Sequence, residues 1–115
     1  MSANAAQGMN VAPSVIETIV TLAARDVEGV AFIGPQATSG LISKLSTKPL
    51  TQGIEVQTDE NGLVNISIRM DVKSGYVLPD VAAKVREAVA DAMAMQVGME
   101  VGSVDIFIDG IQFRN

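Results

Sequence analysis

The 115-residue chain contains neither cysteine nor histidine. The absence of cysteine excludes disulfides, thiolate zinc sites and thiol nucleophiles, and it is typical of a protein of the reducing cytosol. The absence of histidine removes the commonest metal ligand and the usual proton shuttle of enzymes that work near neutral pH. No serine of the chain therefore has a histidine to activate it.

Basic residues are scarce as well. The chain has 8 lysines and arginines against 13 aspartates and glutamates, which gives a net charge of −5 and an isoelectric point near 4.5. Binding to duplex nucleic acid depends on clustered lysine and arginine, and adhesion to anionic lipid depends on a polybasic face. We therefore expect no nucleic-acid partner and no direct attachment to lipid.

Long apolar runs are missing too. No stretch approaches the roughly 20 apolar residues that a membrane-spanning helix requires. Residues 1–8 also lack the basic start and the apolar centre of a secretory signal. We expect a cytoplasmic protein without direct membrane insertion, which a protein partner would have to recruit to the inner face of the membrane.

The clearest pattern that is present predicts a hairpin of two strands. Residues 64–72 alternate strictly between apolar and polar side chains, which indicates a strand with one buried and one wet face. A shorter alternation over residues 54–58 precedes it, and the Asn61-Gly62 pair between the two can adopt the positive φ angles of a hairpin turn.

Two helices are predicted by apolar residues at helical spacing. The first follows Pro13, with Ser14 and Glu17 at capping-box spacing. Its apolar stripe consists of Val15, Ile19, Ala23 and Val27, widened by Ile16, Val20 and Ala24. The second begins near Pro79, ends at Gly98 and leads into a last strand over residues 103–109. Residues 110–113 are expected to form a tail that folds back onto the core.

The order of these elements predicts an α+β two-layer sandwich, in which a mixed β-sheet carries two long helices packed on one face. The strands on either side of the second helix should run parallel, joined by a right-handed crossover. Residues 1–8 are expected to be a disordered lead, and residues 9–115 a single domain with a long loop at about 35–52. A loop of that length is usually mobile or functional.

Two places in this fold are candidate partner surfaces. Phe107 falls on the polar side of the last strand, so its ring should lie on the open face of the sheet, where Arg69 also points. The alternative is that the tail or the long loop covers the ring. Leu41, Ile42 and Leu45 of the long loop could dock on a partner, or they could close one end of the core.

Carboxylates are the remaining candidates for chemistry. Asp71, Asp105 and Asp109 share the polar face, where they could hold a hard cation or a small ligand, or pair across strands with Arg69 and Lys73. An RNA-binding module of the KH type has a similar mixture of strands and helices, but it needs a Gly-x-x-Gly loop that this acidic chain lacks. The residues supply no catalytic set and indicate no cofactor.

Four segments together resemble the alkaline shock protein family of Gram-positive bacteria. They are Val11 to Glu17, Ala23 to Val30, Tyr76 to Pro79, and Val104 to Ile111, with Glu28-Gly29-Val30 as the most specific join. The resemblance implies a small cytoplasmic scaffold or adaptor without catalytic activity, which supports the cell envelope under stress. It also implies a homo-oligomer and a membrane-anchored protein partner. The loop at residues 34–53 departs from the family pattern.

Overall fold

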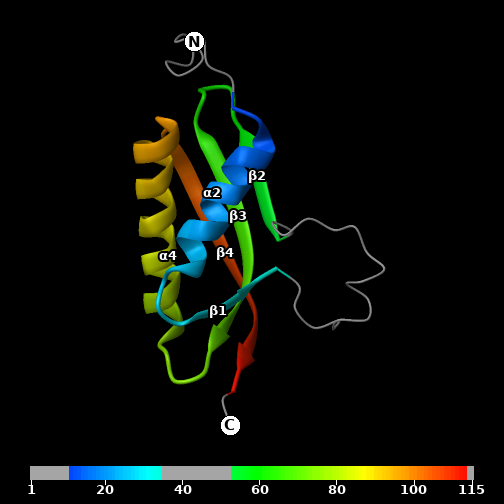
Figure 1. Ribbon diagram of the computed structural model, residues 1–115, viewed down its shortest axis with the longest axis vertical. Helices are drawn as coiled ribbons and strands as arrows, with labels where there is room; N and C mark the ends of the chain where they lie inside the picture. Colours follow the sequence, from blue (N-terminus) through cyan, green and yellow to red (C-terminus); the bar gives the residue numbers. More distant parts are fainter. Residues whose placement is uncertain (1–10, 35–52, 114–115) are drawn as a thin grey trace, which may run out of the picture.

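The computed structural model describes residues 11–34 and 53–113 (Figure 1). Its elements, in chain order, are α2 (Pro13–Arg25), β1 (Val30–Ile33), β2 (Ile54–Thr58), β3 (Val64–Lys73), α4 (Leu78–Ala92), the π-helical turn η1 (Met93–Val97) and β4 (Val101–Gln112). Both helices lie on one face of a four-stranded sheet. The predicted α+β sandwich with a mixed sheet is confirmed.

Strand β3 is the centre of the sheet. It pairs with β4 in parallel along its whole length, and with β2 and β1 antiparallel. The N–H of Arg69 donates to the Gly53 carbonyl and the Arg69 carbonyl accepts from the Gly34 N–H, so β2 and β1 lie end to end along the same edge of β3. The predicted hairpin and the predicted parallel crossover are therefore both present.

The core lies between the sheet and the helices. On β3 every second residue is buried, as the alternation predicts; these residues are Val64, Ile66, Ile68, Met70 and Val72. The helices cover them with Ile16, Val20, Ala24, Val81, Val85, Val89 and Met93. Each such side chain contributes roughly 1.5–3 kcal/mol through burial. In the described segments no helix has both the length and the apolar character to cross a bilayer.

The start of α2 differs from the prediction. The helix begins at Pro13 after Ala12, and no side chain caps it, so the predicted capping box of Ser14 and Glu17 is wrong. Proline fixes a helical φ and has no N–H to satisfy, which makes a cap less necessary. The assigned stripe is also wrong at Val15, which is 46% exposed, because the helix is rotated to bury Ile16 instead.

The end of β4 differs as well. Residues 110–112 continue the strand and do not form a tail over the core, because β3 still offers partners there: the Ser74 N–H donates to the Gln112 carbonyl at 2.8 Å. The Gln112 side-chain amide also donates to the Asp71 carboxylate at 2.6 Å. Phe113, at 76% exposed, does not cover the core either.

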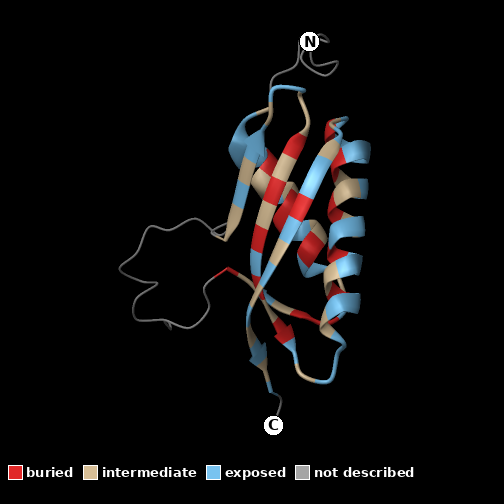
Figure 2. Ribbon diagram, turned by 180° about the vertical axis from the view of Figure 1, so that it is seen from behind, coloured by how far each residue is buried: buried red, intermediate tan, exposed pale blue. Residues whose placement is uncertain are grey.

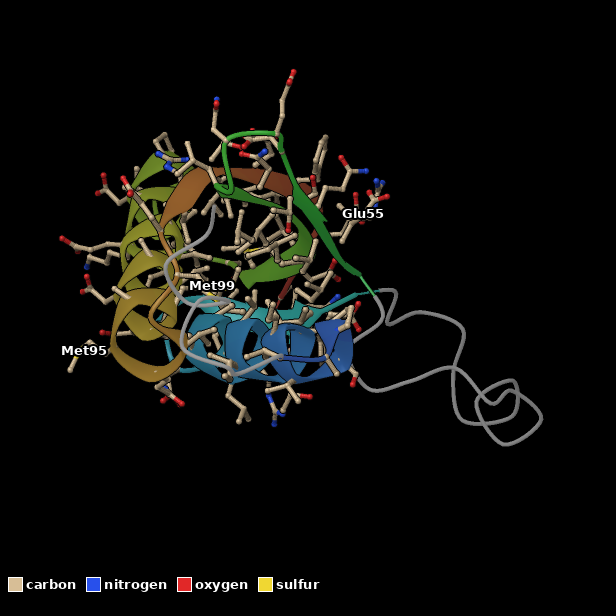
Figure 3. All side chains as sticks on the ribbon, turned by 90° about the horizontal axis from the view of Figure 1, so that it is seen from above. Glu55, Met95 and Met99 are labelled. Atoms are coloured by element: carbon tan, nitrogen blue, oxygen red, sulfur yellow. The ribbon has the colours of Figure 1, made fainter. Side chains whose placement is uncertain are left out.

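The methionines at the end of α4 have different environments. Met93 is completely buried and Met99 packs against the core, whereas Met95 is 85% exposed and points away from the body of the molecule (Figure 3). The prediction that these methionines fill gaps at a helix end is confirmed for Met93 and Met99 and is wrong for Met95. Gly98, with φ +77°, ends the turn in a left-handed conformation.

Candidate protein-interaction surface

The sheet face opposite the helices carries no described element over it. Seen from behind, β2, β3 and β4 have no helix in front of them (Figure 2). We call this surface the open face; it consists of the odd-numbered residues of β3 from Asn65 to Lys73 and their neighbours on the flanking strands. It is where the sequence placed Arg69 and Phe107.

Arg69, Phe107 and Asp109 form one cluster on the open face. Arg69 and Phe107 are directly paired in the parallel register of β3 and β4. The Arg69 guanidinium donates two hydrogen bonds to the Asp109 carboxylate, from Nε and Nη2, each 3.0 Å long. Its Cζ lies 5.5 Å from the centre of the Phe107 ring. A bidentate pair of this kind fixes the plane of the guanidinium, so the ring has a fixed neighbour.

The Phe107 ring is 47% exposed. The prediction that it lies on the open face is therefore confirmed, and residues 110–113 do not cover it, because they continue along β3. An aromatic ring gains free energy when its apolar surface leaves water, and here that surface remains available. Arg69 and Phe107 thus form the part of the predicted partner surface that the structure brings together.

A depression lies beside this cluster. It has a volume of about 470 Å³, opens to solvent and is lined by Gly53, Ile54, Glu55, Ser67, Arg69 and Phe107. Its floor is Ser67, which is opposite Glu55 on β2 and opposite Asp105 on β4. Glu55 lies on the outer side of β2 (Figure 3). A small side chain between two longer acidic ones makes the surface concave at this point.

The carboxylates of the open face do not act as one group. Asp109 is paired with Arg69, as the cross-strand alternative predicted, and Asp71 accepts from Gln112. Asp105 and Glu55 have no hydrogen bond or ion pair to any residue of the described segments. Within residues 11–34 and 53–113 no three acidic residues are grouped so as to hold a metal ion.

Two glycines bring the ends of the long loop together at the edge of this surface. Gly34 and Gly53 bond to the carbonyl and the N–H of the same residue, Arg69. A Cβ on Gly53 would stand 2.5 Å from Gly34 Cα, so the two backbones touch. The predicted partner residues Leu41, Ile42 and Leu45 fall between them, outside the described residues. The signal in the sequence is the pair of glycines that brackets a segment without periodicity.

A second contact joins two of the segments on which the family resemblance rests. The Tyr76 hydroxyl donates to the Glu28 carboxylate at 3.0 Å. Gly29, with φ +101°, lies under the Tyr76 ring and beside Val81. The hydrogen bond to Glu28, then desolvation and the Glu28 charge, hold the pKa of Tyr76 above its ordinary value of 10.0. This contact ties the end of α2 to the start of α4 and has a structural role.

Comparison with known proteins agrees with this resemblance. The model of the alkaline shock protein family, described as having a cell envelope-related function, matches residues 1–113. The uncharacterized protein YqhY of Bacillus subtilis is 30% identical over 105 residues, which cover 91% of this chain and 77% of that protein. The uncharacterized protein Spy1535 of Streptococcus pyogenes serotype M6 is 28% identical over 101 residues, covering 88% and 76%. No solved structure matches.

Proposed function

The chain belongs to the alkaline shock protein family, whose function is related to the cell envelope, and from that premise we propose that it is a non-enzymatic scaffold or adaptor protein of the cell-envelope and alkaline stress response. It acts by self-association and by binding protein partners. The observation that carries the proposal is the exposed Phe107 ring, which Arg69 and Asp109 hold in place on an uncovered sheet face.

This arrangement is suited to binding a protein. Aromatic residues and arginine carry a large share of the binding energy in protein interfaces. A ring whose neighbours are already fixed loses little conformational entropy when a partner covers it. The open face is also only weakly concave, and small-molecule sites usually bury most of their ligand. A flat, partly polar surface with one apolar anchor is typical of a contact between proteins.

Self-association has support of its own in β4. This strand has 12 residues and pairs only with β3 among the described elements, so its other edge has no strand beside it. Unpaired backbone groups along a strand of this length are a template for pairing with another chain. We therefore assign self-association to β4 and partner binding to the open face.

We place the protein in the cytoplasm and assign its recruitment to the membrane to a membrane-anchored protein. Two observations support this assignment: the chain is acidic, with a net charge of −5, and anionic lipid would repel it. A partner that crosses the membrane would supply the anchor that the described part of this chain does not.

Retention on membrane vesicles tests partner binding. The wild-type protein should be retained on vesicles from the source bacterium and should lose retention when the vesicles are first treated with protease. Phe107→Ser should weaken retention, whereas Leu22→Ser, which removes a 55% exposed side chain from the helix layer, should not. Equal retention of both variants would exclude the open face as the binding surface.

Self-association is tested separately by sedimentation velocity over a series of protein concentrations. The weight-average sedimentation coefficient should rise with concentration for the wild type. Ile111→Lys, on the exposed end of β4, should reduce the rise. A coefficient that stays at the monomer value throughout would exclude this part of the proposal.

A further inference from the structure

We infer that the open face recognises a cationic and apolar segment of its partner, with one lysine or arginine side chain placed over Ser67 between Glu55 and Asp105. The inference rests on the proposed function as a protein-binding scaffold and adds the chemistry of the partner. It is carried by the depression, by the charges around it and by the exposed ring at its border.

The register fixes the shape of the recess. Ser67 has Glu55 directly beside it on β2 and Asp105 directly beside it on β4, so the three residues form a row across the sheet. Neighbouring strands are about 4.8 Å apart, which places the two acidic residues roughly 10 Å from each other at the backbone. Because serine is short, the space above it admits one ammonium or guanidinium group with a carboxylate on either side.

The charges decide the sign of the ligand. The positive charge nearest to the depression, that of Arg69, is already compensated by the bidentate pair with Asp109. It therefore does little to neutralise Glu55 and Asp105, which have no ion-pair partner among the described residues. The surroundings of the recess stay negative, and an incoming anion would meet three carboxylates, while an incoming cation would find two that are unpaired.

The apolar side of the recess favours a long cationic side chain over a small ion. Ile54 and the half-exposed Phe107 ring line it beside the carboxylates. Lysine and arginine carry an aliphatic stem that packs on apolar surface while the charged end stays among polar groups. The same ring attracts a cation through its π-electrons. A partner with basic residues among apolar ones matches both parts of this surface.

NMR titration of the full, ¹⁵N-labelled chain tests the inference with three synthetic peptides of equal length. Leucine alternates with lysine in the first, with glutamate in the second and with glutamine in the third. The lysine peptide should shift the amide signals of Glu55, Ser67 and Phe107, and the other two should not. The double variant Glu55→Gln/Asp105→Asn should weaken its binding roughly five- to tenfold, as expected for two exposed ion pairs.

A matched double variant controls for net charge. Asp80→Asn/Glu87→Gln removes the same charge from the outer side of α4, where both residues are exposed, and should leave the affinity for the lysine peptide unchanged. Equal weakening in both double variants would show attraction to the acidic chain as a whole and would overturn the inference. Shifts with the glutamate peptide, or none with any peptide, would do the same.

Two further outcomes separate the partner from other occupants and from the proposed function. If the same amide signals shift when the protein alone is concentrated, a second copy fills the recess, and the inference is wrong. If Phe107→Ser loses retention on vesicles while Glu55→Gln/Asp105→Asn keeps it, the open face binds the partner without charge recognition. In that case the proposed function remains and the further inference fails.

Discussion

Tyr76 and Glu28 are 48 residues apart in the chain, yet the phenol of one donates a 3.0 Å hydrogen bond to the carboxylate of the other. Gly29 lies directly under the same ring. Two of the segments that carry the family resemblance, one at the end of α2 and one before α4, are therefore parts of a single contact. Their residues fit one another, which explains in physical terms why both occur in the same chain.

Replacement of Gly29 by alanine should destabilise the fold by about 2–4 kcal/mol. The backbone there has φ +101°, and the new Cβ would stand 2.9 Å from Val81 and 3.0 Å from the Tyr76 ring. Gly75→Ala is the matched control, because Gly75 has φ +94° and nothing within 4 Å of its Cβ position. It should cost about 1–2 kcal/mol. Urea denaturation measures both, and equal losses would show that the contact with Tyr76 is unimportant.

Alkaline pH should weaken the contact between Tyr76 and Glu28. The pKa of Tyr76 is raised in the folded state, so the folded protein holds the phenol proton more tightly than the unfolded chain does. The resulting stabilisation is complete below pH 10.0, the ordinary value, and is lost as the pH rises through the raised pKa. Tyr76→Phe should be less sensitive to pH in this range.

The ionisation itself can be followed directly. Tyr76 is the single tyrosine of a chain without tryptophan, so ultraviolet absorbance reports its phenolate alone. The midpoint of the folded protein should lie above that of the chain unfolded in urea. A midpoint equal to that of the unfolded chain would contradict the hydrogen bond to Glu28.

Met93 and Met95 should respond oppositely to truncation. Met93→Ala leaves a cavity in the core, because Met93 is fully buried, and should cost about 2–5 kcal/mol of unfolding free energy. Met95 is 85% exposed, so Met95→Ala should change the stability by less than about 0.5 kcal/mol. Thermal unfolding of the two variants measures the difference, and similar values would place η1 in a different orientation.

Asp109→Asn should loosen the Phe107 ring without unfolding the protein. The pair between Arg69 and Asp109 is partly exposed, with side-chain exposures of 56% and 39%, so its loss should cost less than about 1 kcal/mol. The guanidinium would no longer be held in one plane beside the ring. Relaxation of the aromatic signals of Phe107 should then report faster motion, and unchanged relaxation would show that the ring is fixed by other contacts.

Gly53→Ala should disturb the edge of the sheet where the long loop leaves it. The residue has φ +102°, and a Cβ there would collide with the backbone of Gly34, which cannot move aside as a side chain can. We expect a loss of about 2–4 kcal/mol and a large change in the amide signal of Arg69. Gly98→Ala, with φ +77° and free space, is the control and should leave the Arg69 signal in place.

The sequence predicts the sheet better than the helices because the two patterns differ in ambiguity. Strict alternation along β3 assigns every side chain to one of two faces, so the buried set from Val64 to Val72 and the exposed position of Phe107 follow directly. In α2 two overlapping apolar stripes fit the helical period. Which of them is buried depends on the packing against β1, β2 and α4, so Val15 was assigned to the wrong side.

The details of the open face lie beyond local patterns. The sequence places Arg69 and Phe107 on the same surface, but their contact depends on the parallel register, which is set by the whole length of the β3–β4 pair. The pairing of Arg69 with Asp109, rather than with Asp71 or Asp105, depends on that register as well. The meeting of Gly34 and Gly53 follows from two strands sharing one edge of β3, for which no motif exists.

The contact of Gly34 with Gly53 separates the architecture of the sheet from whatever chain connects the two residues. Because Arg69 holds both ends with its own backbone groups, the intervening length sets no strand register. Doubling a flexible connection at such a point costs only about 0.6 kcal/mol. The position is thus a natural insertion site, where an epitope, a targeting peptide or an entire extra module could be exchanged between variants of one scaffold.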